Sequence, residues 1–375
     1  GWLEARGNSG FPESSYRGAQ IFNVLLVFLS ALCVLWLARV LAPRRPWVWA
    51  ASVGFFAFLP VVSKTEAMFH PENLNLLCSA AATAAITDMY VRRRRSGVLL
   101  ALTAAAVGLG LATRPAMIFV AAALVLGTGV AITDARIRQV LPWRWIASAG
   151  AAVLFVATPW VAYRAIVQHS GPLNQTSLLF HAALHPEQHL FADRVTSHAY
   201  FFDLNAGVFT HPWRSNFKNE AFPETYVEIW GDWLGHFAFS PYDTAPSAQA
   251  QRVLRDQSWI GVLPTALAIC GWFWLAFATL RRDRGYGPLV LVPLIAVGAY
   301  LYRSYVVLTH DGDVFEATYA INSAPVWALT FGLAAAWVGS RSRLIGIGLG
   351  ALFAIFAVLE LRFMLYGIRD GHPIF

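Results

Sequence analysis

The sequence predicts an all-α polytopic membrane protein with about ten transmembrane helices and one long external loop. The first reason is composition, because 57% of the 375 residues are hydrophobic and only 13% are charged. This is too apolar for a soluble domain of that length. The second reason is that apolar runs of roughly 20 residues, the length that crosses a bilayer as a helix, recur along the chain. The third is a regular alternation of arginine-rich and arginine-poor connections.

The predicted spans, in chain order, are residues 21–41, 47–62, 73–90, 97–111, 116–133, 145–166, 259–280, 287–307, 320–338 and 344–366. The second and fourth runs are short, so either can be a tilted or partly interfacial helix, and the count can change by about one.

The arginines predict the orientation, because Arg and Lys near span ends are retained in the cytoplasm. Every alternate connection is basic, and the basic residues are Arg39, Arg44, Arg45, Arg92 to Arg95, Arg136, Arg138, Arg144, Arg281, Arg282, Arg284, Arg341 and Arg343. All ten histidines and most of the 21 acidic residues fall on the opposite, external side. The chemistry is therefore expected outside the membrane. Nucleic acid is not an expected partner, because the net charge of +7 is strung along span ends and forms no basic domain.

Three segments follow from this topology. Residues 1–166 form an N-terminal transmembrane module, 167–258 a long external loop, and 259–375 a C-terminal transmembrane module. The orientation places Gly1 outside although no signal-peptide pattern precedes it. We therefore expect at least one further span upstream of Gly1, with residues 1–20 forming the end of a first external loop.

A charged cluster occupies the short external connection between the second and third spans. Lys64, Glu66, His70 and Glu72 lie within nine residues at the water boundary. Such a group can bind a divalent cation or an anionic head group, or it can deprotonate a hydroxyl. The alternative is structural, because a Pro followed by Glu72 suits the positive first turn of a helix.

Thr113-Arg114-Pro115 forms the external turn between the fourth and fifth spans. A guanidinium beside the outward N–H groups of a new helix is suited to bind phosphate. The alternative is that Arg114 reaches into the head groups only to anchor the helix end.

Two further external segments carry candidate substrate-binding residues. In the long loop Glu224, Glu228 and Asp232 share one helical face and Trp230 lies beside them, a combination that suits sugar recognition. The alternative is an amphipathic interfacial helix anchored by Trp. Before the ninth span, Asp311 and Asp313 can close a substrate cleft or can belong to a solvated loop.

This layout resembles the GT-C superfamily of membrane glycosyltransferases, which includes protein mannosyltransferases and aminoarabinose transferases. The resemblance lies in the short acidic loop with Glu66 and Glu72, the long loop from Val167, and a turn in which Arg114 replaces the Lys of a Thr-Lys-Gly pattern. It implies transfer of a sugar from a polyprenyl-phosphate carrier to a glycan, lipid or protein acceptor. The signature acid of that superfamily follows its first span, a part for which this sequence has no match.

By this resemblance Glu66, His70 and Glu72 are candidate catalytic residues, and Arg114 and Lys64 are candidate lipid-phosphate ligands. A divalent cation is a candidate cofactor, and the expected location is the bacterial plasma membrane with the site on its external side. A transporter or lipid flippase is the main alternative, which predicts internal repeats and polar residues near the membrane midplane. A non-catalytic membrane scaffold is a third interpretation.

Overall fold

The computed structural model describes residues 13–67, 71–114, 116–166, 202, 204–212, 221–231, 248–306 and 317–369. Within these ranges the secondary structure is helical. The longer helices are α1 (Glu13–Leu41), α2 (Pro46–Ala57), α4 (Glu72–Val91), α5 (Gly97–Thr113), α6 (Met117–Ala131), α8 (Trp143–Ile166), α12 (Ala248–Arg281), α13 (Gly287–Val306), α14 (Ala324–Gly339) and α15 (Arg343–Arg369). Shorter elements are α3 (Pro60–Ala67), α7 (Ala135–Val140), α11 (Ala221–Trp230) and the 3₁₀ helices η3 (Ala206–Phe209), η5 (Arg284–Tyr286) and η6 (Ala317–Ser323).

The structure confirms an all-α membrane protein. A helix occupies each predicted span, and five helical stretches of the described chain are long and apolar enough to cross a membrane. These are Gly18–Leu41, Glu72–Val91, Gln251–Arg281, Arg284–Tyr302 and Ala320–Gly339. Shorter apolar helices occupy Pro46–Ala57, Gly97–Thr113, Met117–Ala131 and Leu344–Leu359, so the count of ten spans stays a prediction.

Two predicted boundaries differ from the structure. The run 47–62 is divided between α2 and α3, which meet at Phe58-Leu59-Pro60. Proline lacks the amide proton needed inside a helix, so it starts a new helix here. The helix of the seventh predicted span begins at Ala248, within the segment predicted as external loop, so α12 extends the span toward α11.

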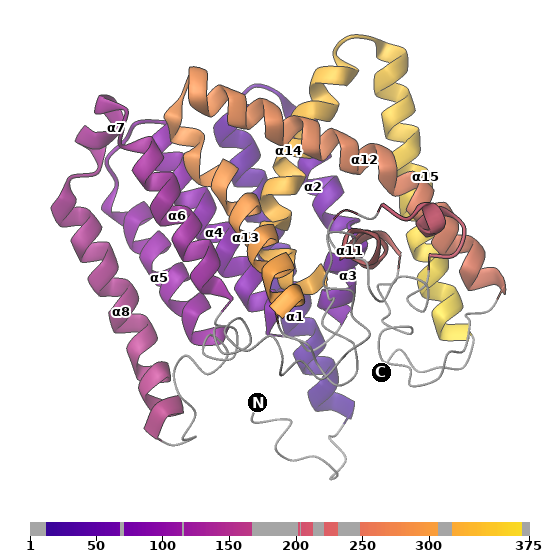
Figure 1. Cartoon of the computed structure of the whole chain (residues 1–375), viewed down its shortest axis with the longest axis horizontal. Coiled ribbons are helices and arrows are strands. Elements are labelled where there is room, and N and C mark those ends of the chain that lie inside the picture. Colours follow the sequence, from indigo (N-terminus) through magenta and orange to yellow (C-terminus); the bar gives the residue numbers. More distant parts are fainter. Residues whose placement is uncertain are drawn as a thin grey trace.

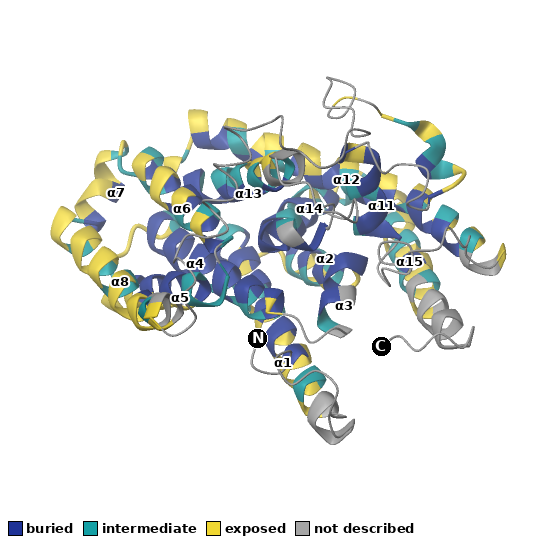
Figure 2. Ribbon diagram, turned by 60° about the horizontal axis from the view of Figure 1, so that its bottom comes forward, coloured by how far each residue is buried: buried dark blue, intermediate teal, exposed yellow. Residues whose placement is uncertain are grey.

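Helix α4 is the most enclosed of the long helices (Figure 2), and it packs against α1, α5 and η6. Helices α6 and α13 pair on one side of it, and α14 lies between α2 and α12 on the other (Figure 1). One apolar core joins α1, α4, α5, α6 and α13. A second joins α2, α14, α15 and the outer helix α11. These two cores fix the outer end of α4 relative to α11 and η6.

Glycines allow the closest helix crossings. A methyl group added at Gly332 of α14 would overlap the Ser52 side chain and the Val48 carbonyl of α2. Between α6 and α13, Gly127 and Gly287 bring two backbones together, and a Cβ at Gly127 would lie 2.6 Å from Pro288. Small residues at helix crossings of this kind are typical of membrane bundles, where van der Waals packing holds helices together.

The outer surface of the bundle is apolar. Phe155 on α8 is 82% exposed, Val125 on α6 is 70% exposed, and Phe273 on α12 is 61% exposed. Exposed apolar surface of this extent marks contact with lipid in a protein of this composition. Figure 2 shows the exposed residues concentrated on peripheral helices such as α8.

A charge network joins the connections predicted to be cytoplasmic. The Asp88 carboxylate is 2% exposed and accepts hydrogen bonds from Arg94 Nη2 and Trp36 Nε1, each at 2.8 Å, while Arg92 Nε lies 2.9 Å from it. Arg93 has a φ of 50° and places its guanidinium 3.6 Å from Asp134 and 3.7 Å from Asp283. Three acids at this end of the bundle are thus bound by one arginine run. We call Arg92, Arg93, Arg94, Asp88, Asp134 and Asp283 the arginine brace.

Candidate active site

The outer ends of α3 and α4 are held together by buried polar groups. Asn73, fully buried in the first turn of α4, donates from Nδ2 to the Thr65 carbonyl of α3 at 2.7 Å. The Thr65 hydroxyl donates to the Val61 carbonyl at 2.7 Å. These hydrogen bonds therefore fix the end of α3, which carries Glu66, against the start of α4, which carries Glu72.

Glu72 and Arg114 form an ion pair at this end of the bundle. Arg114 Nε lies 3.1 Å from Glu72 Oε1, and the Asn75 amide donates from Nδ2 to Glu72 Oε2 at 3.2 Å. The Glu72 side chain is 1% exposed, whereas that of Arg114 is 26% exposed. The charge of Glu72 also opposes the positive first turn of α4. The structure thus brings together a predicted catalytic acid and the predicted phosphate ligand.

Glu66 lies near the end of α3, and its side chain is half-buried. Burial raises the pKa of the Glu66 carboxyl above its ordinary value, because the carboxylate loses part of its hydration. A carboxylate with a raised pKa is a stronger base when it is ionised, which suits proton transfer. The Lys64 side chain and all of His70 lie outside the described residues.

Helix α11 places two of the predicted substrate-binding acids inside the protein. Glu224 and Glu228 are each 2% exposed and are one helical turn apart. Helix α11 contacts α3 and η6, so these acids belong to the same outer assembly as Glu66 (Figure 1). The predicted helix in this segment is confirmed over Ala221–Trp230, and Asp232 lies outside the described residues.

Trp230 faces a different set of neighbours from Glu228. Its Nε1 donates to Thr265 Oγ1 of α12 at 2.9 Å, and Tyr226, one turn earlier, donates to the Ser258 carbonyl at 2.5 Å. This face of α11 therefore rests on α12, and the helical spacing points Glu224 and Glu228 away from it. The structure does not bring the Trp230 ring to the face that carries the two acids.

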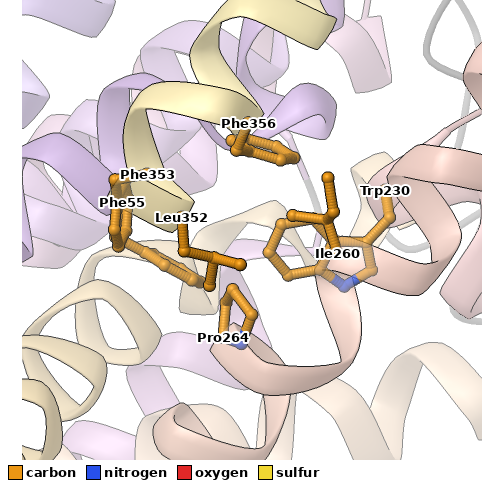
Figure 3. Close-up of a pocket in the computed structure, with 7 residues that line it drawn as sticks. All are labelled: Phe55, Trp230, Ile260, Pro264, Leu352, Phe353 and Phe356. Atoms are coloured by element: carbon orange, nitrogen blue, oxygen red, sulfur yellow. The ribbon is translucent and has the colours of Figure 1, made fainter. Parts of the chain in front are cut away.

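Trp230 also lines an apolar pocket between the membrane helices and α11 (Figure 3). The pocket is lined by Phe55, Trp230, Ile260, Pro264, Leu352, Phe353 and Phe356. Phe55 and Phe356 meet the Trp230 ring edge to face, with centroids 6.0 and 5.4 Å away. The lining is apolar, so the pocket offers no group to orient a sugar.

Helix α4 has a buried polar face that was not predicted from the sequence. Asn75, Ser79, Thr83 and Thr87 recur every four residues and are all buried. Ser79 donates from Oγ to the Asn322 carbonyl of η6 at 2.8 Å, which ties η6 to α4. The four-residue spacing inside an apolar run was the available signal, because it marks one side of a helix.

Other predicted site residues are not placed. Asp311 and Asp313 lie outside the described residues. Among the residues that the structure describes, no group of three or more His, Cys, Asp or Glu side chains could hold a metal ion.

One protein family matches part of the chain. Residues 8–163 match the model of a family described as dolichyl-phosphate-mannose-protein mannosyltransferase. This match supports a GT-C superfamily glycosyltransferase. It covers less than half of the chain, includes Glu66, Glu72 and Arg114, and ends before α11. No curated protein sequence and no solved structure matches the chain.

The match confirms the resemblance to the GT-C superfamily. A match to this family implies transfer of a sugar from a polyprenyl-phosphate donor to an acceptor by an integral membrane enzyme.

Proposed function

We propose that the protein transfers a sugar from a polyprenyl monophosphate carrier to a hydroxyl or amine acceptor at the external face of the membrane. The observation that carries this proposal is the Glu72–Arg114 pair, which lies within the family match and beside the half-buried Glu66. It combines, at one end of the bundle, a cation for the carrier phosphate and a carboxylate for the acceptor.

Arg114 is the proposed phosphate ligand. Glu72 contacts its Nε and so orients the guanidinium, while a quarter of the Arg114 side chain stays exposed. The phosphate gains negative charge as the sugar leaves, so a fixed guanidinium stabilises the transition state more than the ground state. Lys64 is proposed as a second cation, because it lies on α3 beside the same connection.

Glu66 is the proposed base, with His70 as a further candidate from the same connection. The acceptor oxygen or nitrogen attacks the anomeric carbon, and its proton passes to the Glu66 carboxylate. The bond between the anomeric carbon and the phosphate oxygen breaks, and its electron pair leaves with the phosphate. The products are the glycosylated acceptor and the polyprenyl phosphate, so the step needs no other reactant.

The remaining predicted residues complete the proposal. Glu224 and Glu228 on α11, with Asp232 following, are proposed to bind acceptor or sugar hydroxyls, and Asp311 and Asp313 to close the site from the side of η6.

The test is transfer by the purified full chain in lipid nanodiscs, with polyprenyl-phosphate mannose as donor and a mixture of peptide, glycan and lipid acceptors. We expect a glycosylated acceptor from the wild type and none from Glu66→Gln. A matched control, Glu13→Gln, changes an acid at the start of α1 and is expected to retain transfer. Movement of labelled polyprenyl-phosphate mannose across the bilayer with no glycosylated product would support a lipid flippase instead.

A further inference from the structure

Two asparagine side chains near the start of α4 and in η6 are buried with acceptor atoms that no described residue satisfies. Asn75 is fully buried and Asn322 is 2% exposed. The Oδ1 atom of each has no hydrogen-bond partner among the described residues. Asn75 belongs to the first turns of α4, and Asn322 belongs to η6.

The contacts of these residues place them close together. Ser79 follows Asn75 by one helical turn on the same face of α4, and its hydroxyl donates to the Asn322 main-chain carbonyl at 2.8 Å. Asn75 in turn donates to Glu72 at 3.2 Å, and Glu72 pairs with Arg114. These contacts therefore link Arg114 through Glu72 to the Asn75 amide, and Asn322 is held against Ser79, one helical turn further along the same face of α4.

The atoms left without partners define the chemistry that they can bind. An amide oxygen accepts a hydrogen bond, so its ligand must be a donor. Burial of a carbonyl oxygen without a donor is costly, and native proteins retain such a group where a ligand or an ordered water completes it. A neutral amide compensates no charge, which favours hydroxyl donors over an ammonium group.

We propose that Asn75 and Asn322 form the subsite that binds hydroxyl groups of an uncharged donor sugar. The proposal rests on the proposed function and assigns the sugar to the α4–η6 side of the Glu72–Arg114 pair. Asn75 then has two roles, because its Nδ2 also holds Glu72 in place for Arg114. Asn322 is the cleaner probe, since its contact to Ser79 uses the main chain.

The experiment compares two lipids and three proteins in nanodiscs. The lipids are polyprenyl phosphate and polyprenyl-phosphate mannose, and the proteins are wild type, Asn322→Leu and the control Thr103→Val. Leu has the same number and branching of side-chain heavy atoms as Asn and lacks the amide. Thr103 is a buried residue of α5 whose hydroxyl donates within its own helix, so it controls for loss of a buried polar group.

We expect polyprenyl-phosphate mannose to stabilise the wild type and Thr103→Val against unfolding more than polyprenyl phosphate does. In Asn322→Leu this difference between the two lipids should vanish, and KM for polyprenyl-phosphate mannose should rise about tenfold. Polyprenyl phosphate alone should stabilise all three proteins equally. An undiminished difference between the two lipids in Asn322→Leu would overturn the subsite and assign the amide to bound water. A wild type that both lipids stabilise equally would overturn it too.

A second measurement needs no variant. Donors that lack one mannose hydroxyl are compared with the wild-type enzyme, and we expect KM to rise about tenfold for at least one of them, because its loss leaves a buried amide unpaired. Equal KM values for all the donors would contradict the subsite. If neither lipid stabilises the wild type and no transfer occurs, the proposed function fails, and the subsite fails with it.

Discussion

Removal of Arg114 tests both the packing and the chemistry of the outer end of α4. Arg114→Ala takes away the guanidinium that lies 3.1 Å from Glu72 and leaves a carboxylate that is 1% exposed, with the Asn75 amide still donating to it. Loss of one partner of a buried ion pair costs roughly 3–5 kcal/mol. Because Arg114 is 26% exposed and water reaches the pair, we expect the lower value, about 3 kcal/mol of unfolding free energy.

The partner change has a smaller expected effect. Glu72→Gln removes the buried charge and leaves a partly exposed arginine that water can hydrate, so we expect a loss of about 1 kcal/mol. The double variant Glu72→Gln/Arg114→Ala buries no charge at this position. Its loss should therefore be smaller than that of Arg114→Ala alone, with a coupling energy of about 2 kcal/mol between the two sites.

The assay combines unfolding in mixed micelles with transfer from polyprenyl-phosphate mannose. If Arg114 binds the phosphate, the double variant regains stability and stays about a hundredfold or more below wild type in kcat/KM. Arg138→Ala serves as control, because Arg138 is an exposed arginine at the other end of the bundle. A coupling energy near zero would refute the ion-pair reasoning. Recovery of transfer in the double variant would assign Arg114 only to neutralising Glu72.

Three further outcomes are expected. Asp88→Asn should lower the unfolding free energy by about 1–3 kcal/mol in the same micelle assay, because this buried carboxylate accepts hydrogen bonds from Arg94 and Trp36. An effect no larger than that of Asp134→Asn would count against the arginine brace. Gly332→Val should cost about 1–3 kcal/mol by pushing α14 from α2, whereas Gly150→Ala, which meets open space, should stay within about 0.5 kcal/mol. Burial raises the pKa of the Glu66 carboxyl above its ordinary value of 4.5, so ionisation of this group is disfavoured in the folded state. Its contribution to the unfolding free energy is therefore present at low pH and is lost as pH rises through the raised pKa. Over the same pH window, above 4.5, kcat/KM should rise as the carboxylate forms. A wild-type pH profile with no rise above that value would contradict the role of Glu66 as base.

The fold could be predicted where one helix contains the whole signal. The run 73–90 became Glu72–Val91, because its apolar residues, its Pro71 start and its arginine end are all local. The break in 47–62 was also local, since Pro60 cannot donate within a continuing helix. The spacing of Glu224 and Glu228 likewise predicted the helix of α11 correctly.

The site needed tertiary information. Glu72 and Arg114 are 42 positions apart, and only the packing of α4 against α5 and α6 shows that they pair. Trp230 follows Glu228 by two residues, yet its ring points to α12 because a helix turns by about 200° over that interval. The link from Ser79 to Asn322 joins residues 243 positions apart, and no pattern in either segment indicates it.

The arginine brace has a consequence for how the chain enters the membrane. The positive-inside rule predicts that the arginines of the 92–94 run direct this connection to the cytoplasm during insertion, and in the folded protein the same arginines bind Asp88, Asp134 and Asp283. These acids come from connections far apart in the chain, so the network closes only when all three emerge on the same side. A misoriented helix pair would separate Arg93 from Asp134 or Asp283, whereas Asp88 would keep Arg92 and Arg94 from its own connection. The arginine brace therefore makes the stability of the folded protein depend on correct insertion of these helices.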